Sequence, residues 1–293
     1  VKLLIISGRS GSGKSTALNM LEDHGYYCID NLPASLLQAF VSRICRDTPE
    51  LPRVAVSIDA RNIPEDLKNV PQILHELQLS ALNIEIIFLD ANSPTLIKRF
   101  SESRRRHPLT SNTVGLREAI IQERELLEPI SAMAGLSIDT STMSVHQLRE
   151  VVRSRILEKK DSSLSVMFES FGFKNGVPID ADFVFDARCL PNPYWDSQLR
   201  PLSGLDAPVA DYLSNEPDVQ ALLQDIEAFL DRWLPRFEAS NRSYMTVAIG
   251  CTGGQHRSVF LCEQLKLAFA DKINNLQVLH RELRRRQDNT NAT

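Results

Sequence analysis

Short apolar runs alternate with amphipathic stretches through the first half of the chain. The runs have the length of buried strands, and the stretches carry apolar residues at helical spacing. Regular alternation of these two patterns is typical of βα units around a parallel sheet. The predicted strands are residues 3–6, 26–30, 54–59, 84–90 and 136–139, and the predicted helices are residues 15–22, 34–46, 65–79, 93–104 and 118–128, with one more beginning at the capping box Ser144–Gln147.

The pattern changes after a polar stretch without periodicity at residues 158–163, which predicts a domain boundary. We therefore expect an α/β protein with one domain over residues 1–157, a second over 164–286 and a polar tail over 287–293. In the second domain the predicted elements are the apolar runs 164–171 and 183–185, a proline-rich loop at 190–196, a helix over 219–237, a strand at 245–249, a helix over 258–270 and a last strand at 276–279.

The first predicted strand leads directly into a match to G-x-x-x-x-G-K-[ST], the phosphate-binding P-loop motif. Glycines permit backbone angles that turn N–H groups toward a phosphate, and the N-terminus of the next helix adds partial positive charge. In such a loop the lysine reaches the β- and γ-phosphates and the following hydroxyl ligates Mg²⁺. A glycine-rich turn without a ligand is the alternative, but such a turn needs neither the lysine nor the hydroxyl. The nucleotide-binding residues predicted here are Gly8, Arg9, Ser10, Gly11, Ser12, Gly13, Lys14 and Ser15, with Ser15 as the Mg²⁺ ligand.

Acidic residues end four of the predicted strands, at Asp30, Asp59, Asp90 and Asp139. In open α/β sheets the ligand crevice lies at the carboxyl ends of the strands. We expect either Asp59 or Asp90 to help hold Mg²⁺ or its water, and the sequence does not decide between them. For each aspartate alone, a helix N-cap or a loop residue is the alternative interpretation.

Three consecutive arginines, Arg104 to Arg106, stand at the end of the predicted helix 93–104 and just after it. Guanidinium groups fit phosphate oxygens, so this segment is a candidate lid over a nucleotide. A solvated helix end, favoured by the helix dipole, explains it equally well.

A second strand, glycine-rich turn and helix occur at residues 245–270, with the turn at 250–257. Backbone N–H groups at Gly253 and Gly254, with His256 and Arg257, predict a second anion-binding loop. A plain tight turn is one alternative. Another is a cysteine-dependent phosphatase, because Cys251 and Arg257 have the C-x₅-R spacing and Asp196 is a conceivable acid. No residue just before Cys251 activates the thiol, so we favour binding of a phosphorylated small molecule.

The chain's last predicted strand is followed by a basic segment with Arg281 and Arg284 to Arg286, and Lys272 and Lys266 could extend the patch. Such a patch suits contact with nucleic-acid phosphates. A solubilising charged terminus is the alternative, because aromatic residues are not interleaved with the arginines.

Composition places few further limits. The 293 residues are 43% hydrophobic with a formal net charge of −4, which argues against nucleic-acid binding spread over the whole surface. The five cysteines include no C-x-x-C pair, so neither a disulfide framework nor a zinc site is indicated. No apolar run approaches the roughly 20 residues needed to span a bilayer, and no signal-peptide pattern is seen. We expect a cytoplasmic protein with no membrane partner.

In these motifs the chain resembles the RapZ family, the P-loop nucleotide-binding RNase adapter proteins of bacteria. The resemblance covers nearly the whole chain and is carried by residues 7–15, 22–23, 27–33, 57–62, 104–109, 168–174, 190–193 and 248–258. It implies a kinase-like N-terminal domain with ATPase and GTPase activity, which binds ATP at the P-loop and GTP through Asp59, Ala60, Arg61 and Asn62.

The resemblance also implies that the C-terminal domain senses glucosamine-6-phosphate. The residues that carry this role over are Cys251, Thr252, Gly253, Gly254, His256, Arg257 and Ser258. In enteric relatives this domain binds a small RNA, through a basic patch that corresponds here to Lys272, Arg281, Arg284, Arg285 and Arg286, and presents it to an endoribonuclease that lowers production of glucosamine-6-phosphate synthase. Those relatives are homo-oligomers. Gln255 stands where the enteric loop has a lysine, so one contact to ligand or RNA is in doubt.

Together these observations predict a nucleotide-binding protein with slow NTP hydrolysis whose C-terminal half binds a phosphosugar and RNA. A small-molecule P-loop kinase is the first alternative, and a cysteine-dependent phosphatase is the second. The sequence leaves open the preference for ATP or GTP.

Overall fold

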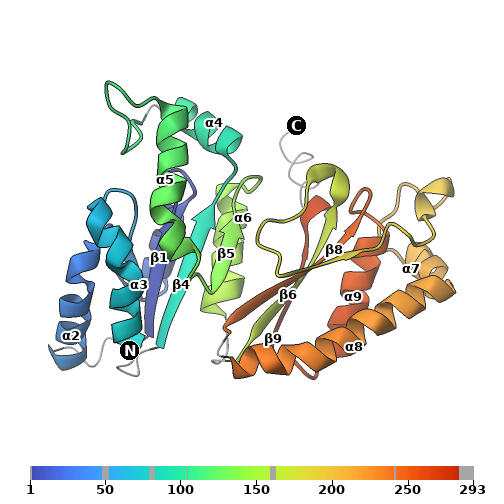
Figure 1. Cartoon of the computed structure of the whole chain (residues 1–293). Coiled ribbons are helices and arrows are strands. Elements are labelled where there is room, and N and C mark those ends of the chain that lie inside the picture. Colours follow the sequence, from blue (N-terminus) through green and yellow to red (C-terminus); the bar gives the residue numbers. More distant parts are fainter. Residues whose placement is uncertain are drawn as a thin grey trace. The chain divides into compact units, whose positions relative to one another are not determined.

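A computed structural model describes residues 2–47, 53–78, 83–103, 105–158, 163–240 and 242–283 (Figure 1). The chain divides into two units, residues 1–158 and 159–293. Each unit has its own parallel sheet, with helices packed against the strands. The predicted α/β fold with parallel sheets is therefore confirmed.

The sheet of the first unit has five parallel strands in the order β2-β3-β1-β4-β5. The central strands are continuous apolar runs because helices cover both of their faces. The strands are β1 (Lys2–Gly8), β2 (Tyr27–Ile29), β3 (Arg53–Ser57), β4 (Asn83–Asp90) and β5 (Leu136–Asp139).

The helices of the first unit form two layers. Apolar side chains of α2, α3 and α5 share one core with β1, β3 and β4, and these helices lie along one face of the sheet in Figure 1. On the other side α1 packs against α6. The helices are α1 (Lys14–Asp23), α2 (Leu37–Asp47, after a 3₁₀ turn at Ala34–Leu36), α3 (Pro64–Gln78), α4 (Ser93–Ser103), α5 (Leu116–Ser131) and α6 (Val145–Val152, continued by a π-helical turn at Arg153–Leu157).

The strand order determines where a ligand crevice lies. The chain leaves β1 toward β2 on one side of the sheet, and it leaves β4 toward β5 on the other side. The carboxyl ends of the neighbours β1 and β4 therefore form a topological switch point, which is the usual ligand position in open α/β sheets. The loop after β1, residues 9–13, begins at this point.

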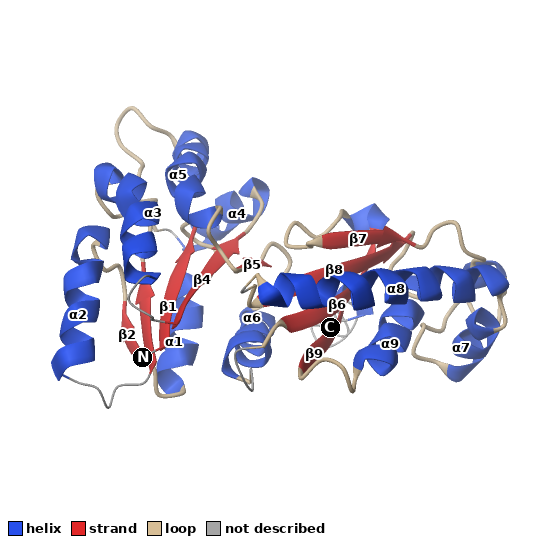
Figure 2. Cartoon of the chain, turned by 60° about the horizontal axis from the view of Figure 1, so that its bottom comes forward, coloured by secondary structure: helices blue, strands red, loops and turns tan. Residues whose placement is uncertain are grey.

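The second unit has a four-stranded parallel sheet in the order β7-β8-β6-β9. One core joins its strands to α7, α8 and α9, and the long helix α8 runs across the sheet in Figure 2. The elements are β6 (Ser165–Gly172), β7 (Phe183–Asp186), α7 (Ala207–Ser214), α8 (Pro217–Ala239), β8 (Tyr244–Cys251), α9 (Arg257–Phe269) and β9 (Asn275–His280), with 3₁₀ turns at Phe173–Asn175 and Pro193–Trp195.

Most predicted elements differ from the observed ones by only a few residues at their ends. The capping box at the start of α6 is present as predicted, since the hydroxyl of Ser144 accepts from the N–H of Gln147 and the Gln147 side chain accepts from the N–H of Ser144. Helix α7 was not predicted. No described helix is both long and apolar enough to cross a membrane.

Candidate functional site

The loop between β1 and α1 needs glycine at both positions that the P-loop motif fixes. Gly8 has φ +144° and Gly13 has φ +106°, backbone angles that residues other than glycine rarely adopt. A Cβ on Gly8 would lie 2.0 Å from the carbonyl oxygen of Leu89, and a Cβ on Gly13 would lie 2.5 Å from Cδ2 of Leu148. The tight turn between strand and helix therefore depends on these two residues.

Side chains from distant elements bind the carbonyl groups of this loop. Nη1 of Arg99 donates to the oxygen of Gly11 at 2.9 Å, and Oγ1 of Thr140 donates to the oxygen of Ser12 at 2.9 Å. A trans peptide points its N–H away from its carbonyl, so the N–H of Gly13 faces away from Thr140. The first N–H groups of α1 have no partner within the helix. The loop is thus shaped in advance as an anion-binding turn.

Lys14 is buried and folded back over the start of the loop. Its Nζ donates to the oxygens of Gly8 (2.7 Å) and Arg9 (3.2 Å) and lies 3.9 Å from Oδ2 of Asp59. Burial lowers the pKa of Lys14, and the charge of Asp59 opposes this shift. Ser15, the next residue, is exposed at the first turn of α1.

Asp59, which comes just after β3, is the strand-end aspartate nearest to the lysine. Arg61 binds its carboxylate through Nε and Nη2, and the same Nη2 reaches Asp30 at 3.0 Å. Burial by itself raises the pKa of Asp59, but the hydrogen bonds of Arg61 and the charge of Lys14 outweigh it and lower the pKa. Asp59 is therefore an anion beside Lys14, as a Mg²⁺ partner requires.

Other predicted residues of this unit have structural partners. Nε of Arg9 donates to Asp90 at 2.7 Å, so both side chains are engaged with each other. Asn62 accepts from the N–H of Ala34 through Oδ1, and Ala60 is buried. The structure brings Asp59 and Arg61 to the lysine, and it does not bring the Asn62 side chain or Asp90 there.

The sequence pattern alone did not single out the side chains that support the loop. They are Arg99, Thr140, Glu123 and His107. Both side-chain oxygens of Glu123 accept from the N–H of Ser10 at 2.9 Å. Glu123 had a detectable signal, because a carboxylate stands in the apolar stripe formed by Ile120 and Leu127. Of the three consecutive arginines, Arg105 and Arg106 are exposed and Arg104 lies outside the described residues.

The loop between β8 and α9 surrounds the thiol of Cys251. The thiol accepts from the N–H of Gly254 at 3.2 Å and lies 3.2 Å from the hydroxyl of Ser258. Burial by itself raises the pKa of this thiol, but the hydrogen bonds with Ser258 and Gly254 and the charge of Arg257 together outweigh burial, so the pKa is lowered. Gly254 has φ +68°.

Two buried side-chain nitrogens in this loop have no hydrogen-bond partner within the described residues, Nε2 of His256 and Nε of Arg257. Nη1 of Arg257 is held by the oxygens of Arg188 (3.0 Å) and Leu190 (2.9 Å). Its Nη2 lies 3.4 Å from Oγ1 of Thr252, so the edge formed by Nε and Nη2 faces the loop. An unpaired buried N–H is costly, and an anion at this edge would accept from Nε of Arg257.

Gln255, in the turn between β8 and α9, makes structural contacts. Its side-chain amide donates to the oxygen of Leu202, and its own carbonyl accepts from the N–H of Gly204 at 2.9 Å. The residue therefore connects the turn after β8 to the segment before α7.

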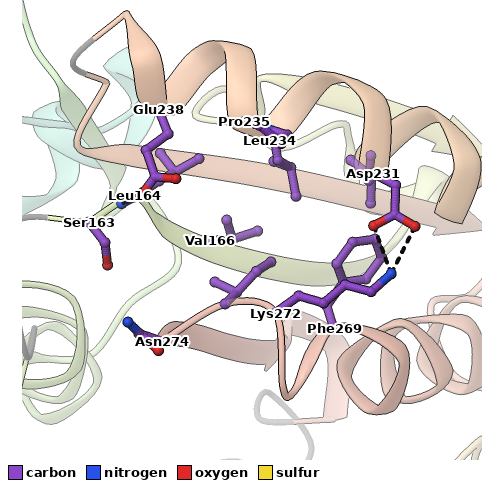
Figure 3. A pocket seen from close by; sticks show the side chains of 12 residues that line it. Ser163, Leu164, Val166, Asp231, Leu234, Pro235, Glu238, Phe269, Lys272 and Asn274 are labelled. Carbon is purple, nitrogen blue, oxygen red and sulfur yellow. Dashed lines mark hydrogen bonds and ion pairs between the residues drawn. The ribbon is translucent and has the colours of Figure 1, made fainter.

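The basic residues predicted to bind RNA are only partly described. Lys272 is paired with both oxygens of Asp231 at 2.8 Å, on the rim of a cavity of about 310 Å³ beneath α8 (Figure 3). The apolar floor of this cavity includes Leu164 and Val166 at the start of β6, the end of the sheet opposite to Cys251. Nε of Arg281 lies 3.3 Å from Glu282. Arg284, Arg285, Arg286 and the tail 287–293 lie outside the described residues.

Metal-ligating side chains do not gather anywhere in the described ranges: no group of three or more His, Cys, Asp or Glu could hold an ion. A site for Mg²⁺ would therefore need oxygen ligands from a bound nucleotide, with Ser15 and Asp59 as the candidate protein groups.

Comparisons with known proteins cover both units. The RapZ-like N-terminal domain matches residues 1–160, and the RapZ C-terminal domain matches residues 164–284. A nucleotide-binding protein of Stutzerimonas stutzeri is 56% identical over 284 residues, 97% of this chain and 100% of the relative. A nucleotide-binding protein of Azotobacter vinelandii is 55% identical and also covers 97% of this chain and 100% of its own length.

Several solved structures of kinases match about half of the chain. A shikimate kinase from Bacteroides thetaiotaomicron is 16% identical and covers 52% of this chain and 94% of its own, with a TM-score of 0.34.

Proposed function

The chain belongs to the RapZ family, and from this premise we propose that it binds a nucleoside triphosphate at the loop between β1 and α1. One observation carries the proposal: side chains from outside the loop donate hydrogen bonds to the carbonyls of Gly11 and Ser12, and a buried lysine lies beside them at the N-terminus of α1. Phosphate oxygens fit this arrangement because they accept the free N–H groups. The nucleotide-binding proteins at over 50% identity support it.

Mg²⁺ fits the same site. The hydroxyl of Ser15 and the carboxylate of Asp59 would hold the ion or its water, and the ion would neutralise charge on the bound phosphates. Lys14 would bind the phosphates from the other side. ATP and GTP are both proposed ligands, with slow hydrolysis as a secondary activity.

The test is equilibrium binding of ATP and GTP with Mg²⁺ to the full chain. Lys14→Ala should abolish binding of both, because it removes the charge that meets the β- and γ-phosphates. The matched control is Lys68→Ala, an exposed lysine on α3 that should bind like the wild type. Unchanged binding or unchanged hydrolysis in Lys14→Ala would reject the assignment.

For the second unit we propose a phosphosugar site at the loop after β8, with glucosamine-6-phosphate as the ligand. The unpartnered N–H of Arg257 Nε supports an anion there, and Nε2 of His256, which also lacks a partner, would add a second donor when the ring is protonated. The sugar itself is proposed from the family resemblance. Titration with glucosamine-6-phosphate should show binding that His256→Gln weakens, whereas unphosphorylated glucosamine should not bind. Equal binding of both sugars would contradict the proposal.

An RNase adapter role is proposed from the same resemblance, with a small RNA and an endoribonuclease as partners, a homo-oligomeric state and a cytoplasmic location. The basic segment at the end of the chain is its proposed RNA contact. Small RNAs should co-purify with the wild type and be lost, with steep salt dependence, when Arg284, Arg285 and Arg286 are changed to alanine. If no RNA is enriched, the adapter role fails and the nucleotide site is unaffected.

Two enzymatic alternatives have direct tests. A small-molecule kinase would transfer label from ATP to a metabolite, whereas hydrolysis alone releases free phosphate. The lowered pKa of Cys251 favours a cysteine phosphatase as the second candidate. Such an enzyme would hydrolyse an aryl phosphate and lose this activity in Cys251→Ser, so an inactive wild type removes it.

A further inference from the structure

A buried carboxylate holds one residue of the P-loop from behind. Both side-chain oxygens of Glu123, on α5, accept from the N–H of Ser10 at 2.9 Å, and Oε1 also accepts from the Ser10 hydroxyl at 2.7 Å. The side chain of Glu123 is 0% exposed. A charge this deeply buried is costly unless it is fully hydrogen-bonded. Both donors of Ser10 are therefore committed to the protein rather than to a ligand.

His107 completes the hydrogen bonding of this carboxylate. Its Nε2 lies 3.0 Å from Oε2 of Glu123, and its Nδ1 accepts from the N–H of Leu109 at 3.2 Å. Because Nδ1 is an acceptor, the ring proton sits on Nε2 and is donated to Glu123. The hydroxyl and N–H of Thr110 both donate to the oxygen of His107. The segment after α4 is thereby fastened to the P-loop through Glu123.

This attachment lies at the terminal-phosphate end of the loop. The lysine of a P-loop reaches the β- and γ-phosphates, and Nζ of Lys14 lies against the oxygens of Gly8 and Arg9, next to Ser10. The segment that His107 fastens begins with the exposed Arg105 and Arg106. Two cationic side chains and the end of the P-loop are therefore held by one buried pair.

We propose that Glu123 and His107 are positioning residues for the terminal phosphate of a nucleoside triphosphate. They fix Ser10, so that the loop's remaining N–H groups and the segment with Arg105 and Arg106 keep one arrangement around that phosphate. Neither residue touches the ligand. The inference rests on the proposed nucleotide binding and adds to it a preference for a triphosphate over a diphosphate.

The test compares Kd values for the non-hydrolysable triphosphate AMP-PNP and for ADP, each with Mg²⁺, on the full chain. Glu123→Gln keeps an acceptor for Ser10 but presents an amide donor to the Nε2–H of His107. His107→Phe keeps a ring against Phe100, whose centroid lies 5.0 Å away, and removes the donor. His107→Gln keeps a donor, and Glu125→Gln changes an exposed carboxylate on the same helix.

Glu123→Gln and His107→Phe should each weaken AMP-PNP binding about tenfold, the loss of one charge-assisted hydrogen bond. ADP binding should weaken by less than about threefold, roughly 0.6 kcal/mol. His107→Gln should restore most of the AMP-PNP affinity, and Glu125→Gln should leave both Kd values unchanged. Melting temperatures without nucleotide separate this pattern from a general loss of stability.

Equal losses for AMP-PNP and ADP, or no loss for either, overturn the positioning role. If Glu123→Gln does not fold, the two His107 variants decide the question by themselves. A wild type that binds neither nucleotide rejects the proposed function, and the inference falls with it. A wild type that binds both, with variants that do not discriminate, rejects the inference alone.

Discussion

Thr140, just after β5, is the side chain whose loss should damage the P-loop most selectively. It is buried, and its single hydroxyl proton is shared between the oxygens of Ser12 (2.9 Å) and Asp90 (3.0 Å). Oγ1 of Thr140 also accepts from Nη1 of Arg99 at 3.0 Å. Thr140→Val keeps the shape of the side chain and removes the hydroxyl. The variant leaves the carbonyl of Ser12 and one guanidinium N–H with a missing partner.

An unsatisfied buried polar group costs about 1–3 kcal/mol. For a unit of this size we expect the melting temperature to fall on the order of 5 °C. The N–H of Gly13 is also released from its fixed direction, and the loss of one hydrogen bond to a charged phosphate should weaken Mg·ATP binding about tenfold. Calorimetry measures the binding, and thermal unfolding followed by circular dichroism measures the stability.

The control for Thr140→Val is Thr95→Val on α4. The Thr95 hydroxyl donates to the oxygen of Ser141 at 3.3 Å and does not contact the loop. It should leave ATP binding unchanged. If Thr140→Val binds ATP as tightly as the wild type, the hydrogen bond from Thr140 to the carbonyl of Ser12 does not shape the phosphate site.

Three further predictions concern single residues. Gly254→Ala should destabilise the second unit and abolish phosphosugar binding. Gly254 has φ +68°, and a Cβ on it would lie 2.5 Å from the backbone nitrogen of Gly172. Gly253→Ala is the control: its Cβ would meet no atom within 4 Å, so the melting temperature of the unit should not change. Burial lowers the pKa of His256 below its ordinary value of 6.5, so sulfate should bind more tightly as the pH falls through that pKa and the ring gains a proton. In a titration from pH 8 to pH 5, roughly the range in which histidine titrates, the affinity of His256→Gln for sulfate should increase less than that of the wild type. Equal slopes would contradict it. Asp59→Asn should weaken ATP binding more with Mg²⁺ than with EDTA, and equal weakening would remove Asp59 from the metal site.

Local sequence was sufficient for the framework of the first site. The spacing of Gly8, Gly13 and Lys14 has meaning within one strand, turn and helix, so the motif predicted the turn without tertiary information. The parallel sheet followed from the alternation of apolar runs and amphipathic stretches. The position of Asp59 beside Lys14 required the strand order, because β1 has both β3 and β4 as neighbours and the sequence does not say which aspartate approaches the lysine.

The supporting side chains were harder to predict because they lie far away in the sequence. Arg99 and Thr140 bind the loop from 88 and 128 residues beyond it, and only the folded sheet brings them there. Glu123 could be recognised as a charge in an apolar stripe, but its partner Ser10 could not. Helix α7 was missed because it is short and follows a proline-rich segment that predicts loop.

A crystal structure of the full chain with AMP-PNP and Mg²⁺ would show whether the turn after β1 binds the nucleotide phosphates. We expect the phosphates to lie against the N–H groups of Gly13, Lys14 and Ser15, with the ion near Ser15 and Asp59. A nucleotide bound elsewhere, with this turn empty, would contradict it.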